Sequence, residues 1–145
     1  MSELIIDCDV DPFVPPHWKV KKHQKGGQWQ WNPDQIVLRP TGVRETDITC
    51  HKHYEVFAGY EVLNANVLDF LLAHRQRVPE LWRGKLIMFP GTIFEDIGAG
   101  GGFIGLMVNA ARGLAWENGE WISGFKYLEN GWPDTIVMAT LRNLT

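Results

Sequence analysis

Trp116-Glu117-Asn118-Gly119-Glu120-Trp121 is the stretch of the 145-residue chain that decides the fold. Asn-Gly at its centre favours a two-residue hairpin turn, because both central positions of a type I′ turn require a positive φ. The turn would place Glu117 opposite Glu120 and then Trp116 opposite Trp121, as a cross-strand aromatic pair. The sequence therefore predicts an antiparallel β-hairpin here.

Short apolar runs bounded by turn residues surround this hairpin and predict further strands. Residues 121–127 continue the hairpin with strand alternation, and a final strand is expected at 135–139. Earlier strands are expected at residues 4–6, 28–31, 36–38, 86–89 and 92–94. Residues 51–56 also alternate in character, which favours a strand there as well.

One segment, at about residues 65–77, has the spacing of an amphipathic helix. Asn64 or Asn66 can cap its N-terminus, and Pro79 follows its end. Its apolar face is formed by Val67, Leu68, Leu71 and Leu72. These patterns predict an α+β fold, in which an antiparallel sheet of hairpins or a meander packs against one main helix. Since no linker or repeat interrupts the chain, residues 1–145 are expected to form a single domain.

The composition limits the class of protein. Hydrophobic residues make up 45% and charged residues 21%, which excludes an intrinsically disordered chain. A net charge of -3 argues against a dedicated nucleic-acid binder. Cys8 and Cys50 form neither a disulfide framework nor a CxxC metal motif. Without a signal peptide or an apolar run of about 20 residues, a cytoplasmic protein with no membrane partner is expected.

Several segments together carry a family resemblance. The chain resembles a family of small uncharacterised bacterial proteins in five stretches that occur in the same order, at residues 6–15, 23–36, 62–74, 82–85 and 91–93. The resemblance covers most of the chain and implies a soluble bacterial protein. It implies no reaction, cofactor or functional residue, because that family has no established activity.

Residues 18–31 combine basic and aromatic side chains in an otherwise acidic chain. The candidate binding residues in this segment are Lys21, Lys22, Lys25, Trp29 and Trp31. Lysines beside exposed tryptophans suit single-stranded nucleic acid, through phosphate contacts and base stacking, and they equally suit an acidic protein surface. The alternative is a solvated edge strand whose lysines prevent pairing with other sheets. The leading hypothesis is a non-catalytic binding or interaction protein with an unknown protein or nucleic-acid partner.

The rival hypothesis is a metal-dependent hydrolase. Asp7, Asp9 and Asp11 would share one face of a strand, as would His51 and His53. Carboxylates suit hard cations, and histidines with a carboxylate suit zinc or iron. The plainer interpretation is a strand that ends in an Asp-Pro turn and histidines on the surface. The rival therefore depends on whether Asp7 and Asp9 meet His51 and His53 in one pocket, and no catalytic residue or cofactor is assigned.

A glycine-rich motif and a high tryptophan content also need an interpretation. Gly100-x-Gly102-x-x-Gly105 matches the dinucleotide-binding fingerprint, but it comes too late in a short chain to open such a fold, so a wide loop is preferred. The seven tryptophans are expected to cover one face of a small sheet, with Trp82, Trp116 and Trp121 in the core. Exposed tryptophans or strand edges could also close a homodimer.

Overall fold

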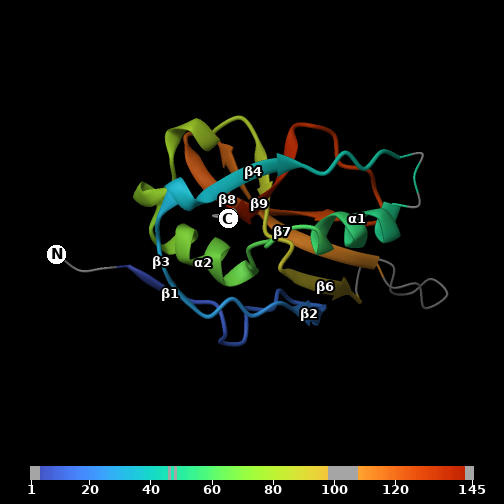
Figure 1. The fold of residues 1–145 in the computed structure, drawn as a ribbon, viewed down its shortest axis with the longest axis horizontal. Coiled ribbons are helices and arrows are strands. Elements are labelled where there is room, and N and C mark those ends of the chain that lie inside the picture. Colours follow the sequence, from blue (N-terminus) through green and yellow to red (C-terminus); the bar gives the residue numbers. More distant parts are fainter. Residues whose placement is uncertain (1–3, 46, 48, 98–107, 143–145) are drawn as a thin grey trace.

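A seven-stranded sheet forms the centre of the protein (Figure 1). The computed structural model describes residues 4–45, 47, 49–97 and 108–142. The longest strand, β7 (Val108–Glu117), pairs with β8 (Glu120–Tyr127) along one edge and with both β5 (Leu86–Met88) and β6 (Thr92–Asp96) along the other. The sheet continues from β6 to β2 (Trp18–His23), and from β5 to β9 (Ile136–Leu141) and β4 (Ile36–Pro40).

The predicted hairpin is present between β7 and β8. Trp116 pairs with Trp121 and Glu117 with Glu120, in the predicted register. Asn118 and Gly119 have φ values of 52° and 82°, as a turn with two positive-φ residues requires. The two indole rings meet edge to face with centroids 5.2 Å apart. The local turn chemistry alone was therefore enough to predict this register.

A break between β5 and β6 shapes the site described below. Both strands run antiparallel to β7, and the N–H of Phe89 still donates to Arg112 O of β7 at 2.9 Å, but residues 90–91 then turn away from β7, and Gly91 meets residues 63–64. The N–H of Gly91 donates to Leu63 O at 2.8 Å, and the N–H of Leu63 donates to Ala139 O of β9 at 3.0 Å. A Cβ on Gly91 would lie 2.8 Å from the backbone N of Asn64. This close approach requires glycine and fixes Asn64 at the junction.

The α+β class is confirmed, with two corrections. The sheet is mixed, because β5 and β9 pair in parallel while its other strand pairs are antiparallel in the described part of the chain. Two helices of similar length are present, α1 (Thr49–Ala58) and α2 (Ala65–Ala73), so the expectation of one main helix is wrong.

The strand expected at residues 51–56 is also wrong, because this segment lies within α1. The buried residues Thr49, His53 and Phe57 recur every four positions, which is helical spacing. The exposed His51 reaches Glu55 across one turn at 3.0 Å. The alternation that suggested a strand spans too few residues to reveal this longer period.

The predicted helix α2 begins as expected but ends early. Asn64 is its N-cap, and its side chain accepts a hydrogen bond from the N–H of Asn66. The helix ends at Ala73, and a separate 3₁₀ turn follows at Arg75–Arg77. His74 separates α2 from this turn, because its φ of -134° is not helical. Its ring Nδ1 is hydrogen-bonded to Phe70 O at 2.9 Å. Another 3₁₀ turn, Glu80–Trp82, places Trp82 in the core.

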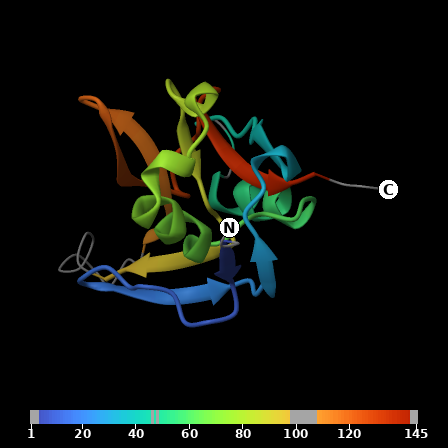
Figure 2. The ribbon, with the colours of Figure 1, turned by 90° about the vertical axis from the view of Figure 1, so that its left-hand side faces the viewer.

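A second, two-stranded sheet packs beside α2 (Figure 2). Its strands, β1 (Ile5–Asp7) and β3 (Gln28–Gln30), are antiparallel, with Ile6 opposite Trp29. The side chain of Asn66 in α2 donates to Asp7 O at 3.2 Å, which ties this small sheet to the helix. A 3₁₀ turn, Pro33–Gln35, then leads into β4. None of the helices in the described ranges is long and apolar enough to cross a membrane.

Candidate functional site

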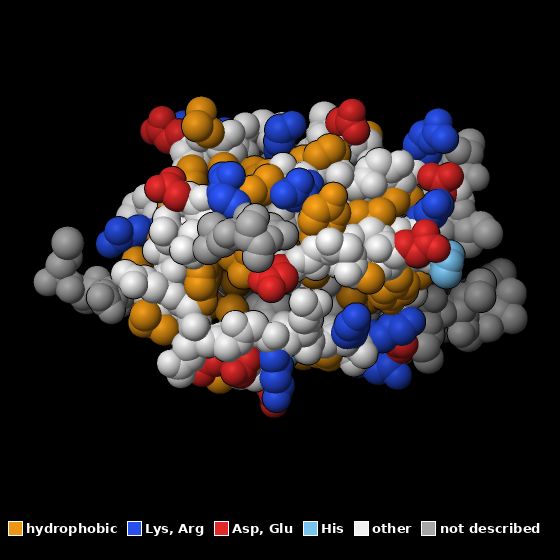
Figure 3. Space-filling model, viewed as in Figure 1, with side chains coloured by type: hydrophobic (Ala, Val, Ile, Leu, Met, Phe, Trp, Pro, Cys, Tyr) orange, Lys and Arg blue, Asp and Glu red, His pale blue; other side chains and the backbone are white. Residues whose placement is uncertain are grey.

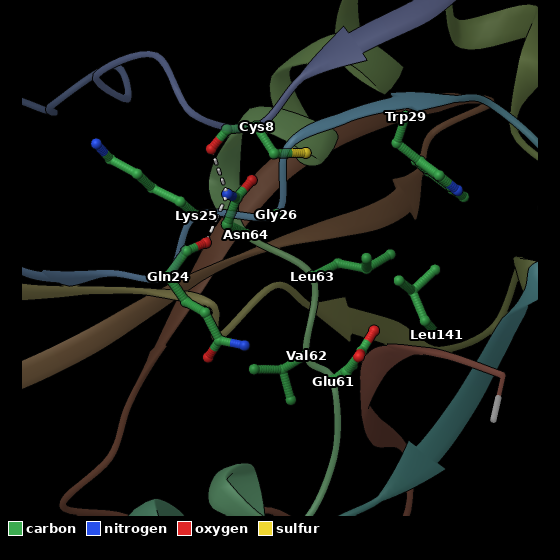
Figure 4. Close-up of a pocket in the computed structure, with 10 residues that line it drawn as sticks. All are labelled: Cys8, Gln24, Lys25, Gly26, Trp29, Glu61, Val62, Leu63, Asn64 and Leu141. Carbon is green, nitrogen blue, oxygen red and sulfur yellow. Dashed lines mark hydrogen bonds between the residues drawn. The ribbon is translucent and has the colours of Figure 1, made fainter.

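A groove runs between β3 and the connection from α1 to α2. It consists of two adjoining cavities of about 300 and 780 Å³ that share Trp29, Glu61 and Leu141. Figure 4 shows the smaller cavity, with Trp29 and Leu141 at one end and Gln24 and Lys25 at the other. We call this feature the β3 groove and define it by the side chains that give it character: Lys25, Trp29, Arg39, Tyr60, Glu61 and Arg142.

Three segments that are distant in sequence form the walls of the β3 groove. The first is β3 with the loop before it, the second is residues 58–63, and the third is the end of β9 beside β4. Backbone hydrogen bonds hold these walls together. The N–H of Leu141 donates to Glu61 O at 2.9 Å, and the N–H of Arg142 donates to Gln35 O at 2.6 Å. The groove is therefore built on paired backbone.

Asn64 organises the inner end of the groove. Its side-chain NH₂ donates to Cys8 O and to Gln24 O, both at 3.0 Å, as drawn in Figure 4. Its Oδ1 accepts the N–H of Asn66 at 3.0 Å and so caps α2. One buried side chain thus joins the end of β1, the loop after β2 and the start of α2.

Two of the predicted binding residues, Lys25 and Trp29, lie in the β3 groove, and Trp29 is half-buried. Its indole N–H donates to Gln35 Oε1 at 3.0 Å, which fixes the ring between β3 and the turn before β4. Trp31 lines neither cavity: its half-buried ring packs on Trp82 and Phe70, and it meets Trp29 edge to face with centroids 5.8 Å apart. The expected open aromatic surface is therefore limited to Trp29.

The lysines of β2 do not join the groove. Lys21 donates to Asn109 Oδ1 at 3.1 Å and lies 4.0 Å from a Glu95 oxygen, while Lys19 contacts Glu95 at 3.2 Å. Lys22 is exposed on the same strand. The positive charge predicted for this segment is thus partly neutralised by β6. Of these lysines, Lys25 lines the groove, at its rim: in Figure 4 its ammonium group points away from the other lining side chains.

The three cations of the β3 groove, by contrast, have no carboxylate partner within 4.0 Å among the described residues. Arg39 lies over the Tyr60 ring, 4.7 Å from its centroid, and its Nε donates to Thr140 Oγ1 at 3.2 Å. The Nε of Arg142 donates to Asp34 O at 3.2 Å. Among the residues that the structure describes, Glu61 is the only acidic side chain that lines either cavity. The groove therefore offers a net positive surface.

Neither cysteine is an activated nucleophile. Burial, with smaller contributions from Asp9 and Asp7, raises the pKa of Cys8 to about 11, so the thiol in the groove stays protonated at neutral pH. Burial, reinforced by Glu129, also raises the pKa of Cys50. Both thiols are therefore structural.

A polar cluster surrounds Cys50 between α1 and β7. The Nδ2 of Asn109 donates to Cys50 Sγ at 3.3 Å and to Glu129 Oε2 at 3.0 Å. Burial raises the pKa of Tyr54 to about 12, and its buried hydroxyl has no hydrogen-bond partner in the described part of the chain. Lys21 lies 5.8 Å from the centroid of the same ring. The cluster joins α1 to the sheet and lies apart from the groove.

The structure separates the two halves of the proposed metal site. Asp7 and Asp9 close a loop: Asp7 accepts the N–H of Asp9, and Asp9 accepts the N–H of Gly27. His51 and His53 lie on α1, at the opposite end of Figure 1 from β1, and His53 faces the core. Among the described residues no group of three or more His, Cys, Asp or Glu side chains could hold a metal ion. The convergence that the hydrolase hypothesis required is absent from this part of the chain.

The glycine motif Gly100-x-Gly102-x-x-Gly105 lies outside the described residues. On the face shown in Figure 3, most of the described Lys and Arg side chains are dispersed among Asp and Glu side chains, with one small group of them at the lower right. That face therefore does not resemble a surface that follows a nucleic-acid backbone.

Comparison with known protein families, curated proteins and solved structures finds no match to this chain.

Sequence reasoning missed Arg39, Tyr60, Glu61 and Arg142. Each is a single polar or aromatic residue without a local motif. They meet only because residues 58–63 pair with β9 and because β4 lies beside β9. Lys25 and Trp29 were found because a local contrast of charge and aromatic content marks their segment.

Proposed function

We propose that the protein is a non-catalytic binding protein whose ligand site is the β3 groove. The observation that carries the proposal is a set of three cations without carboxylate partners in the described chain, placed around two aromatic side chains in one continuous groove. Hydrogen-bonded backbone on each side preforms the walls, so binding does not require the groove to be built first. A ligand that carries negative charge fits this lining.

The lining favours recognition over chemistry. A nucleophile or general base needs a shifted pKa and a partner within hydrogen-bond reach. The raised pKa of Cys8 keeps its thiol protonated at neutral pH. The side-chain oxygen and NH₂ of Asn64 are both hydrogen-bonded to backbone groups, so neither is available for catalysis. Lys25, Arg39 and Arg142 are suited to hold an anion by charge and hydrogen bonding. A bacterial origin, which the sequence resemblance implies, and a cytoplasmic location, which the sequence led us to expect, belong to the same proposal.

The proposal is tested by mapping ligands onto the groove by NMR. Acidic, neutral and basic peptides and single-stranded oligonucleotides are titrated into the isotopically labelled protein, and backbone and indole shifts are followed. We expect anionic ligands to shift Lys25, Tyr60, Arg142 and the indole N–H of Trp29. The expected affinity falls with added salt, since exposed charges are screened within about 10 Å at 0.1 M ionic strength.

Charge-reversal variants test the groove, and the same change outside it is the matched control. Lys25→Glu and Arg142→Glu are each expected to weaken binding about tenfold or more, because each replaces an attraction with a repulsion. Lys126→Glu makes the same change of charge at an exposed position on β8, outside the groove, and is expected to bind as wild type. Equal weakening by all three variants, or shifts confined to other faces, would refute the groove as the ligand site.

A further inference from the structure

The free edge of β3 identifies the kind of partner. β1 covers one edge of β3, in the register Ile5–Gln30, Ile6–Trp29 and Asp7–Gln28. The N–H of Cys8 donates to Gly27 O, and the N–H of Trp31 donates to Leu4 O. Hydrogen-bonded pairs alternate along an antiparallel ladder, so Gly27, Trp29 and Trp31 point their backbone groups towards β1. Gln28 and Gln30 therefore point theirs away from it.

These outward groups are unpaired. Within the described ranges no strand, loop or side chain bonds the backbone N–H or C=O of Gln28 or Gln30. An unpaired edge is a template for a further strand. A sheet of only two strands is marginal, and a third strand would stabilise it. The free edge also belongs to the strand that supplies Trp29 to the groove.

We propose that the β3 groove binds an extended acidic peptide, a segment of a partner protein, which adds to β3 as a third, hydrogen-bonded strand. This inference rests on the proposed function and specifies its ligand. Main-chain hydrogen bonds to Gln28 and Gln30 supply affinity, as in other cases of strand addition. Alternate acidic side chains of the peptide meet the unpaired cations of the groove: Lys25, Arg39 and Arg142.

The same observations disfavour nucleic acid as the occupant. Glu61 lines both cavities, and a peptide whose acidic residues alternate with neutral ones can place a backbone N–H beside it, whereas every phosphate of a nucleic acid is negatively charged. Trp29 is half-buried and bonded through its indole N–H, so it is a limited platform for stacking bases. The alternating N–H and C=O groups of β3 likewise match the backbone of an extended peptide, whereas the sugar-phosphate backbone of a nucleic acid carries no N–H donors.

The test compares two substitutions at one position. Proline at Gln30 removes the outward N–H and leaves the bonds to β1, because residue 30 does not donate to that strand. Gln30→Ala removes the same side chain and keeps the N–H. The ligand is a short labelled peptide in which Glu alternates with Val, and Kd is measured by fluorescence anisotropy. We expect Gln30→Pro to weaken binding about tenfold, and Gln30→Ala to remain within about threefold of wild type.

A change in the peptide gives a second test that leaves the protein intact. N-methylation of every second amide, in the frame that faces β3, is expected to abolish binding, while methylation in the other frame is tolerated. Equal Kd values for Gln30→Pro and Gln30→Ala, together with tolerance of both methylation frames, would overturn strand addition. The proposed function would survive that result if Lys25→Glu still weakened binding, and it would fall with strand addition if Lys25→Glu had no effect either.

Other occupants would give different results. Single-stranded oligothymidine that shifts the groove residues when the acidic peptide does not would overturn the peptide assignment. A second copy of this chain would appear in light scattering as a concentration-dependent dimer that Gln30→Pro dissociates, and it would overturn the assignment as well. Binding of the acidic peptide to a monomer, lost in Gln30→Pro and kept in Gln30→Ala, supports it.

Discussion

Substitutions of Asn64 are expected to differ in cost according to which of its three hydrogen bonds each new side chain can restore. Asn64 is 3% exposed, caps α2, and donates to the carbonyl groups of Cys8 and Gln24. The Cys8 carbonyl also faces His23 Nε2 at 3.1 Å, so the Gln24 carbonyl depends more strongly on Asn64. This side chain therefore holds the inner end of the β3 groove in place.

The structure gives the size of each effect. Loss of an N-cap costs about 1 kcal/mol, and each donated bond contributes about 1 kcal/mol net. Asn64→Ala, which loses all three bonds, is expected to lower the free energy of unfolding by about 3 kcal/mol. Asn64→Ser keeps a capping oxygen and should lose about 2 kcal/mol. Asn64→Asp also keeps the cap, but it turns a buried carboxylate towards two carbonyl oxygens, and it should cost at least as much as alanine at pH 7.

Urea unfolding at pH 7, followed by far-UV circular dichroism, measures these differences. Asn32→Ala is the control, since the side chain of Asn32 caps a half-buried 3₁₀ turn through a single hydrogen bond, which it accepts from the N–H of Asp34 at 3.1 Å. It should cost no more than about 1 kcal/mol. An Asn64→Asp protein as stable as wild type would refute the reasoning, because a cap alone would then account for this residue.

Three further predictions concern other parts of the fold. Burial lowers the pKa of His53, so the folded protein resists protonation of this ring. The free energy of unfolding should therefore be level above about pH 7 and fall as the pH drops below 6.5, the ordinary pKa of histidine. Urea titrations at several pH values should show that His53→Gln flattens this slope. Gly91→Ala places a Cβ 2.8 Å from the backbone of Asn64 and should cost more than about 2 kcal/mol by thermal unfolding, whereas Gly124→Ala, where the nearest atom lies 3.8 Å away, should be nearly neutral. Cys8, with a pKa of about 11, should react with an aromatic disulfide at pH 8 far more slowly in the native protein than in urea, and equal rates would contradict its burial.

The sequence predicts those parts of the fold that short-range chemistry determines. The turn at Asn118–Gly119 needs only local backbone preferences, and so does the cap at Asn64, and both are confirmed. The helix at residues 49–58 was missed because its buried face includes His53 and Thr49, which are not apolar. A histidine that bonds Leu128 O at 3.0 Å becomes a core residue only through tertiary contact.

The candidate site divides in the same way. Lys25 and Trp29 are marked by their own segment, whereas Arg39, Tyr60 and Arg142 join them only through the pairing of β4 and β9 and the return of the chain after α1. Lys21, by contrast, was predicted as a binding residue and does not lie in the groove. Its neutralisation depends on Glu95, which pairing of β2 with β6 brings beside it. Charge along the sequence therefore predicted a basic segment but could not identify which lysines remain free.

Amide hydrogen exchange at β3 tests the central claim most directly. In the free protein the amides of Gln28 and Gln30 should exchange quickly and the amide of Trp29 slowly, because only the last points towards β1. Saturation with the acidic peptide should slow exchange at Gln28 and Gln30 and leave Trp29 unchanged. Exchange at Gln28 and Gln30 that is already slow without ligand, or that does not change on saturation, would contradict strand addition in the β3 groove.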